Sequence, residues 1–233
     1  MNSFKYKKNH LFCEGVKVEE ICKNFSTPFY LYSSKTLINN YKLLHKMLNG
    51  INFLIAYSVK ANSNLSVLKT FAKYGAGADV VSIGELKKAL KAGIANNKIV
   101  YSGVGKSKDE IAFALKNKIE QFNVESIEEL ETIAKIAEQL NTSANIALRV
   151  NPDISAGGHP KISTGKKTDK FGIPISEAKK VYELAKKFKS LKIVGIDIHI
   201  GSQIRHLTPF KKAFKKVLSF CMELDRLGFN IKN

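Results

Sequence analysis

The chain alternates short apolar runs with amphipathic segments along almost its whole length. Apolar runs rich in Val and Ile lie at 53–59, 77–81, 98–102, 121–125, 144–151 and 192–200. Segments with apolar residues at helical spacing follow them at 64–75, 82–93, 107–117, 126–140, 176–190 and 209–228. Short apolar strands that alternate with helices are typical of a parallel sheet buried on both faces, so the sequence predicts an α/β fold.

Helix-capping signals support this assignment. Three predicted helices open with Ser and have Glu three residues later, the spacing of a capping box, at Ser82 and Glu85, Ser107 and Glu110, and Ser126 and Glu129. Ser176 is the candidate cap of a fourth helix, and Pro209 lies near the first turn of the last one. Gly75 and Gly93 suit C-terminal caps.

Two architectures fit such a pattern, an open doubly wound sheet and a closed (β/α)8 barrel. No G-x-G-x-x-G motif follows the first strand, which weakens a dinucleotide-binding sheet. Six similar units without a break in composition favour a TIM-type (β/α)8 barrel, of which 229–233 are the start of a seventh strand. We therefore expect a barrel that is truncated within strand seven.

Composition limits the function classes. The formal charge is +18, yet only three of the 38 basic residues are arginines, which disfavours specific nucleic-acid recognition. The three cysteines have no metal-ligand spacing and suit reduced thiols, so no metal site is expected. No apolar stretch has the length of a membrane span, and the first 15 residues lack the apolar core of a signal peptide. We expect a cytoplasmic protein.

The predicted strands end in residues that can carry chemistry. In a (β/α)8 barrel, the carboxyl ends of the strands form the active-site face. These ends carry Lys60, Asp79, Ser102, Glu125, Arg149, Asn151, His199 and Ser202. Each has a plainer interpretation by itself: Lys60 as a solvated strand end, His199 as a core histidine, and Glu85 as a helix cap. Their convergence at one barrel mouth favours an active site.

Several motifs resemble one known family. "AYSVKAN", "GADVVSIGEL", "YSGVGKSKDEI", "LRVNPD", "HPKISTGKKTDKFGI" and "DIHIGSQI" occur in this order. Together they resemble the barrel domain of the fold-type III pyridoxal-phosphate decarboxylases. The "HPKISTG" loop, "KFG" and "HIGSQ" narrow the resemblance to diaminopimelate decarboxylases and away from the polyamine branch. The resemblance implies decarboxylation of meso-2,6-diaminopimelate to L-lysine, the last step of lysine biosynthesis.

The resemblance also implies residue roles. Lys60 matches the lysine that bonds covalently to pyridoxal phosphate, and we expect its pKa to be lowered by burial. His199 matches the histidine that stacks on the cofactor ring, and Ser202 a hydroxyl that reaches the phosphate. Asp79 and Arg149 match residues around the ring.

A long polar loop completes the predicted site. Residues 152–171 resemble a loop over the substrate, in which Ser163, Thr164 and Lys170 are the most family-like positions. Glu85 lies near the pocket in the resemblance, although its spacing also suits a cap.

The family implies a second domain and a partner subunit. We expect residues 1–30 to associate with a separate C-terminal β domain, and 31–233 to form the incomplete barrel. The resemblance implies that the remainder supplies a glycine-rich phosphate loop and a carboxylate for the pyridine nitrogen, and that the complete enzyme is a homodimer. The chain alone is then expected to be inactive. A pyridoxal-phosphate barrel that does not decarboxylate, racemase-like or a cofactor carrier, is the alternative.

Overall fold

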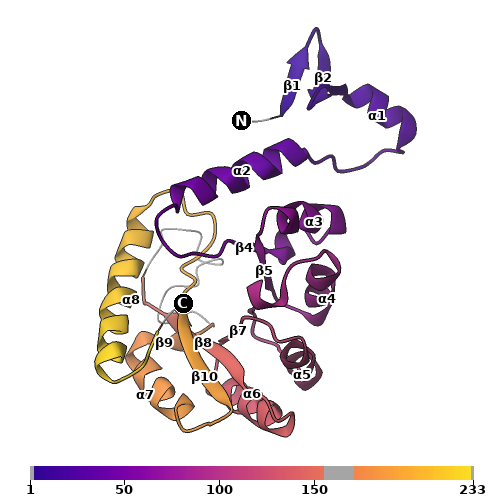
Figure 1. Ribbon diagram of the computed structural model, residues 1–233. Coiled ribbons are helices and arrows are strands. Elements are labelled where there is room, and N and C mark those ends of the chain that lie inside the picture. Colours follow the sequence, from indigo (N-terminus) through magenta and orange to yellow (C-terminus); the bar gives the residue numbers. More distant parts are fainter. Residues whose placement is uncertain (1–2, 155–170, 232–233) are drawn as a thin grey trace.

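A curved parallel sheet forms the body of the protein. The computed structural model describes residues 3–154 and 171–231. Six parallel strands lie in the order β10 (Leu191–Asp197), β8 (Ala144–Asn151), β7 (Gln121–Val124), β6 (Ile99–Tyr101), β5 (Gly77–Val80) and β4 (Ala56–Ser58). A short strand, β9 (Ile173–Pro174), pairs with the end of β8. Figure 1 shows the strands arranged around a common centre with the helices outside them.

The helices cover the outer face of this sheet. They are α3 (Leu65–Lys73), α4 (Ile83–Lys91), α5 (Lys108–Lys116), α6 (Ile127–Gln139), α7 (Ile175–Ala185) and α8 (Thr208–Arg226). Single turns of 3-10 helix lie at Val59–Ala61 and Asn96–Lys98. The predicted α/β barrel architecture is confirmed, because each strand–helix unit adds its strand parallel to the previous one.

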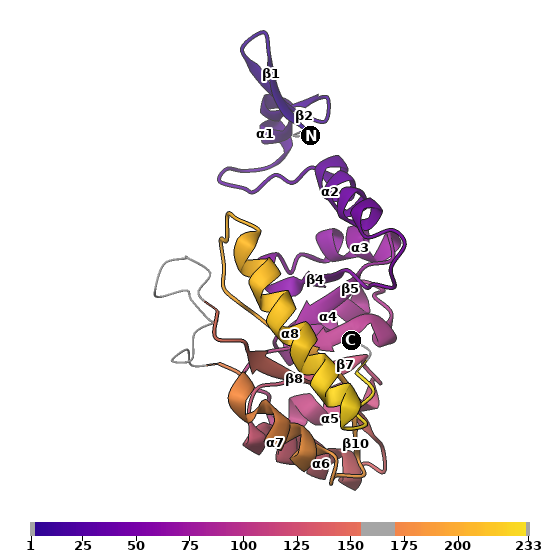
Figure 2. The ribbon, with the colours of Figure 1, turned by 90° about the vertical axis from the view of Figure 1, so that its left-hand side faces the viewer.

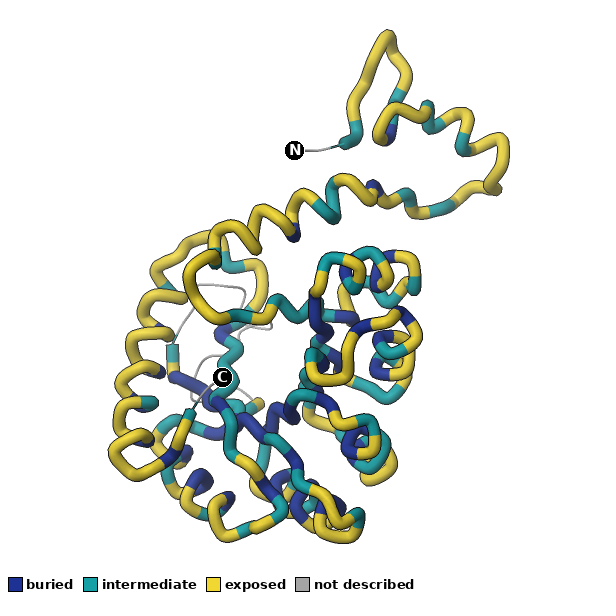
Figure 3. The backbone as a smooth tube through the Cα atoms, in the orientation of Figure 1, coloured by how far each residue is buried: buried dark blue, intermediate teal, exposed yellow. Residues whose placement is uncertain are grey.

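The main core lies between the sheet and these helices. Leu86, Ile111, Leu130 and Ile133 are fully buried on the inner faces of α4, α5 and α6. Figure 3 shows the buried segments on the strands and on the helix faces that meet them. The start of β5 also lies close to the 3-10 turn before β6: a Cβ added at Gly77 would overlap the carbonyl oxygen of Lys98.

A small unit precedes the barrel. It contains the antiparallel strands β1 (Phe4–Lys7), β2 (His10–Cys13) and β3 (Val16–Lys17), and helix α1 (Val18–Asn24). Helix α2 (Ser34–Met47) connects this unit to the body of the molecule, and Figures 1 and 2 both show the unit standing apart from the sheet. Glu14 joins the two parts, because its Oε1 accepts hydrogen bonds from Ser33 Oγ at 2.6 Å and from the backbone N–H of Lys35 at 2.7 Å.

Several predicted details were wrong. Residues 229–231 form no strand; Phe229 and Ile231 instead pack against the core through their side chains. Helix α7 begins before Ser176 and has no side-chain cap. The apolar run before Lys60 contributes only three residues to a strand, and Lys60 lies in the 3-10 turn that follows. The spacing of apolar residues did not predict the short strands β1, β2, β3 and β9, because two to four residues are too few to show a period.

Among the helices of the described residues, none combines the length and the apolarity needed to cross a bilayer.

Candidate active site

The inner face of the sheet and the carboxyl ends of its strands line a cavity of about 560 Å³. The structure brings Lys60, Asp79, Arg149 and His199 together in its wall. The remaining lining residues are Ala56, Val100, Ser102, Gly103, Val104, Gln121, Asn123, Glu125, Phe171, Asp197 and Ile198. Side chains of both charges therefore meet in one hollow, at the face where (β/α)8 barrels carry their chemistry.

Lys60 enters the cavity from a turn rather than from a strand. It lies at the centre of the 3-10 turn Val59–Ala61, directly after β4. Val59 is fully buried and anchors this turn in the core, whereas Lys60 itself is exposed. The expected burial of Lys60 was therefore wrong. Its long side chain lines the cavity from the rim, which leaves the amine accessible to a ligand.

Asp79 is held by hydroxyl groups on both sides. Ser58 Oγ donates to Asp79 Oδ2 at 3.1 Å, and Ser102 Oγ donates to Asp79 Oδ1 at 2.6 Å. The amide of Asn123 in turn donates to Ser102 Oγ at 3.1 Å, and Gln121 Nε2 donates to Asn123 Oδ1 at 2.8 Å. The result is a polar chain that crosses four neighbouring strands, from β7 to β4.

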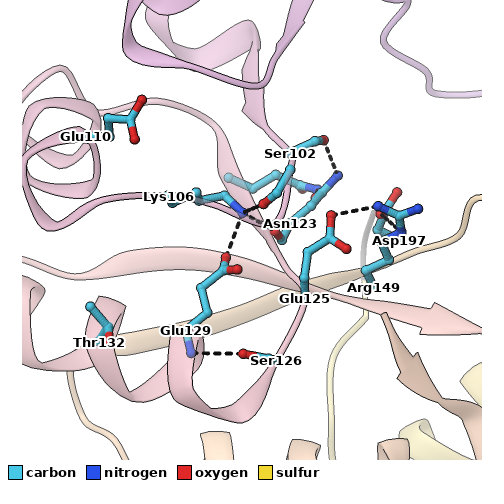
Figure 4. A network of polar contacts seen from close by, with 12 residues as sticks. Ser102, Lys106, Glu110, Asn123, Glu125, Ser126, Glu129, Thr132, Arg149 and Asp197 are labelled. Carbon is cyan, nitrogen blue, oxygen red and sulfur yellow. Dashed lines mark hydrogen bonds and ion pairs between the residues drawn. The ribbon is translucent and has the colours of Figure 1, made fainter. Parts of the chain in front are cut away.

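Arg149 lies between two carboxyl groups on the opposite part of the wall. Its Nη1 donates to Glu125 Oε1 at 2.6 Å, and its Nε lies 4.0 Å from Asp197 Oδ2. Figure 4 shows these three side chains meeting, Glu125 from directly after β7, Arg149 from β8 and Asp197 from β10. Burial raises the pKa of Asp197 to about 6, and the charges of Glu125 and Asp79 add to that effect against the opposing pull of Arg149.

Gly172 and Phe171 enclose Arg149 from the other side. The guanidinium carbon lies 5.8 Å from the centre of the Phe171 ring. Gly172 has a φ of +81°, and a Cβ there would lie 3.0 Å from the carbonyl oxygen of Arg149. This position therefore requires glycine both for its backbone conformation and for the close approach.

His199 is half-buried beside these charges. Burial is the largest cause that lowers the pKa of its imidazole, and the positive charges of Arg149 and Lys60 lower it further. Asp79 and Glu125 oppose this shift. The lowered pKa favours a neutral ring at neutral pH, which suits packing against another aromatic ring.

The buried lysine Lys106 holds the loop after β6 in place. The side chain of Lys106 is 1% exposed, and its Nζ donates to Glu129 Oε1 at 2.6 Å, Gly103 O at 2.7 Å and Asn123 O at 2.8 Å. All three ammonium protons thus have acceptors, as the dashed lines in Figure 4 show in part. This contact fixes the loop after β6 against the end of β7 and the first turn of α6.

The capping glutamates differ from one another. Ser107 and Glu110 form the full capping box that their spacing predicts. Glu129 donates its N–H to Ser126 Oγ but directs its carboxylate to Lys106. Ser82 Oγ caps α4 by accepting from the backbone N–H of Glu85 at 3.2 Å, while the Glu85 carboxylate accepts from the backbone N–H of Val81 at 2.8 Å. Glu85 therefore acts at the helix start and does not line the cavity.

The remaining predicted residues are Ser202 and three positions of the polar loop. Ser202 is exposed and does not line the cavity. Ser163, Thr164 and Lys170 lie outside the described residues. Among the residues that are described, no group of three or more potential ligands could hold a metal ion.

Sequence reasoning missed Ser58, Gln121, Asn123 and Asp197. A signal was present, because polar residues alternate at 121, 123 and 125 and again at 197 and 199. In a parallel sheet buried on both faces, such alternation places one polar row on one face, here the inner one.

The wall residues fit the cofactor that the resemblance implies. Pyridoxal phosphate needs an accessible amine to bond to its aldehyde, a flat partner for its ring and positive charge near its anionic groups. Lys60, His199 and Arg149 provide these groups in one cavity. The volume of about 560 Å³ lies within the usual range for ligand sites.

Comparisons with known proteins show which family the chain belongs to. The family described as pyridoxal-dependent decarboxylase, pyridoxal binding domain, matches residues 34–233. Diaminopimelate decarboxylase of Pseudomonas aeruginosa is 44% identical over 100% of this chain and 56% of that protein. The crystal structure of diaminopimelate decarboxylase from Helicobacter pylori, complexed with L-lysine, has 45% identity and a TM-score of 0.89 over 92% of this chain and 54% of its own. The chain spans about half the length of the curated relatives that it matches. The chain belongs to the pyridoxal-dependent decarboxylase family, and its residues 34–233 match the pyridoxal-binding domain of that family.

Proposed function

We propose that this chain is the cofactor-binding part of an enzyme that decarboxylates meso-2,6-diaminopimelate to L-lysine. The observation that carries this proposal is the gathering of Lys60, Asp79, Arg149 and His199 around one cavity at the carboxyl ends of parallel strands. The 44% identity to a diaminopimelate decarboxylase supports the substrate, as does the L-lysine complex of the Helicobacter pylori relative.

The chemistry divides between the cofactor and the protein. When bound, pyridoxal phosphate supplies an electron-accepting ring that stabilises the negative charge left when carbon dioxide departs. Lys60 would hold the cofactor by its amine and give up that place to the amine of the substrate. Its exposed position at the rim lets the incoming amine reach it.

The other wall residues would orient the ring and balance charge. His199, whose pKa is lowered by burial and nearby cations, offers a neutral ring for stacking. Arg149 is fixed by Glu125 at 2.6 Å, so its positive charge stays in one place in the cavity. Asp79 offers an anchored carboxylate that attracts cationic groups. Ser202, three residues after His199, would offer its exposed hydroxyl to the cofactor phosphate.

The N-terminal unit would serve a second domain. We propose that residues 1–30 pack against a separate β domain, because the unit stands apart from the sheet in Figures 1 and 2. It exposes Tyr6 (76%), Val16 (49%), Phe25 (63%) and Tyr30 (90%), which a partner domain would cover. We further propose that the complete enzyme is a cytoplasmic homodimer.

The test is a carbon dioxide assay. The 233-residue chain should be assayed with pyridoxal phosphate, alone and co-expressed with the remaining half of the Pseudomonas aeruginosa relative. We expect release from meso-diaminopimelate only with the added half, little release from ornithine, and none after Lys60→Ala. Equal turnover of ornithine would refute the proposal that meso-diaminopimelate is the preferred substrate. Cofactor binding without any carbon dioxide release, in a correctly assembled pair, would favour the barrel that does not decarboxylate.

A further inference from the structure

The polar chain that ends at Asp79 is unusual for the inside of a barrel. Barrel interiors are filled mainly by bulky branched apolar side chains. Here the inner face of β7 instead carries Gln121 and Asn123, which are 8% and 5% exposed. Burying amides is costly unless they have hydrogen-bond partners, so a polar row is not the simplest way to fill this space. Filling the interior therefore does not by itself explain this polar row.

The hydrogen bonds in this row all run in one direction. Gln121 donates to Asn123, Asn123 donates to Ser102, and Ser102 donates to Asp79. A serine hydroxyl has one proton, and because Asn123 already supplies a donor to Ser102 Oγ, that proton remains available for Asp79. The amides therefore fix the orientation of the Ser102 hydroxyl, and the hydroxyl fixes Asp79.

The carboxylate of Asp79 is held at both oxygens. Ser102, directly after β6, donates to Oδ1 at 2.6 Å, and Ser58, at the end of β4, donates to Oδ2 at 3.1 Å. The first distance is typical of a charge-assisted hydrogen bond, which is stronger than one between neutral groups. With a donor on each side, rotation of the carboxylate would break a contact in either direction.

The fixed charge of Asp79 reaches the far wall of the cavity. It acts on His199, whose pKa it raises against the opposing cations, and on Asp197, whose pKa it also raises. The groups that face His199 thus include Arg149 and Lys60 as cations and Asp79 and Glu125 as anions. A change in the position of Asp79 would therefore change the pKa of the His199 imidazole.

We infer that Ser102 and Ser58 are positioning residues that hold the Asp79 carboxylate in one orientation in the wall of the cofactor cavity. Asn123 and Gln121 act one step further back by orienting Ser102. None of these four would touch the reacting atoms; they act through Asp79. The inference rests on the proposed cofactor site around Lys60, and its test uses no substrate, so its failure differs from failure of the decarboxylation assay.

The test is a double-mutant cycle between Ser102 and Asp79, measured as the affinity for pyridoxal phosphate by absorbance titration. We expect Ser102→Ala to weaken binding by about tenfold, and Ser102→Thr, which keeps the hydroxyl, to stay within about twofold. In an Asp79→Asn background, Ser102→Ala should change the affinity by less than about twofold, because the group that it positions is already neutral. The matched control is Ser219→Ala, because the Ser219 hydroxyl is exposed and donates only to the Lys215 carbonyl.

A second readout separates positioning from a general loss of structure. NMR titration of His199 should show a shifted midpoint in Ser102→Ala and an unshifted one in Ser102→Thr, and no further shift when Ser102→Ala is added to Asp79→Asn. An effect of Ser102→Ala that persists undiminished in the Asp79→Asn background would overturn the inference. If Ser102→Ala lacks a folded circular dichroism spectrum, Ser58→Ala takes its place in the same cycle, and a persistent effect there would overturn it equally.

Discussion

Arg149 Nη1 lies 2.6 Å from Glu125 Oε1, and this ion pair joins β8 to the residue that directly follows the neighbouring strand β7. The two side chains are 13% and 3% exposed, so the pair is shielded from water. Glu125 Oε2 is buried and has no hydrogen-bond partner among the described residues. Arg149 is thus the donor that compensates a buried carboxylate, and this relationship can be tested by substitution.

Arg149→Met should lower the free energy of unfolding by about 3–5 kcal/mol, the usual range when one partner of a buried ion pair is removed. The cause is the buried charge left on Glu125. Urea denaturation followed by circular dichroism measures the change. Adding Glu125→Gln to Arg149→Met should recover part of the loss, since the uncompensated charge is then gone; no recovery would contradict this account.

Lys106→Met should also cost about 3–5 kcal/mol of unfolding free energy, because three acceptors lose their donor inside the protein. Lys179→Met is the matched control. Lys179 pairs with Glu223 at 3.4 Å, but the two side chains are 43% and 51% exposed. Such surface pairs contribute about 0–1 kcal/mol. Similar losses in the two variants, measured by urea denaturation, would show that burial of the Lys106 pair is not what matters.

Asp197 should make stability depend on pH. Its carboxyl has a pKa of about 6 in the folded chain, against 3.8 for the unperturbed group, so folding takes up a proton between these values. As the pH falls from about 7 to about 4, the wild-type chain should gain roughly 1–3 kcal/mol of unfolding free energy relative to Asp197→Asn. Urea denaturation of both proteins at several pH values measures this difference. A difference that does not change with pH would rule out the raised pKa.

Lys60 should be the residue that bonds to the cofactor. Addition of pyridoxal phosphate and then borohydride should fix the pyridoxyl group on Lys60, as peptide mass spectrometry would detect. Lys60→Ala should lose the visible absorption band of the bound cofactor, whereas Lys69→Ala, an exposed lysine on α3, should retain it. Trapping on a different lysine, with the band intact in Lys60→Ala, would disprove the assignment.

Local patterns in the sequence determined much of the fold. The periods of the apolar residues predicted the helices α3 to α8 and five of the six strands of the curved sheet closely. The Ser107–Glu110 capping box formed as its spacing predicts. Such features depend on neighbours within about four positions, so the order of residues is enough to predict them. Because parallel strands bring their carboxyl ends to one face, the same patterns also predicted that Lys60, Asp79, Arg149 and His199 would converge.

The tertiary structure decided the contacts between strands. Glu129 and Glu110 have the same spacing from a capping serine. The Glu129 carboxylate nevertheless binds Lys106, 23 positions away. Ser102 reaches Asp79 across the same separation in sequence. The exposure of Lys60 and the pKa of Asp197 depend on which side chains the fold places around them. The strength of a charge interaction and the burial of a group depend on distances to residues that are far away in the sequence. A local sequence pattern carries no information about those distances, so only the tertiary structure decides them.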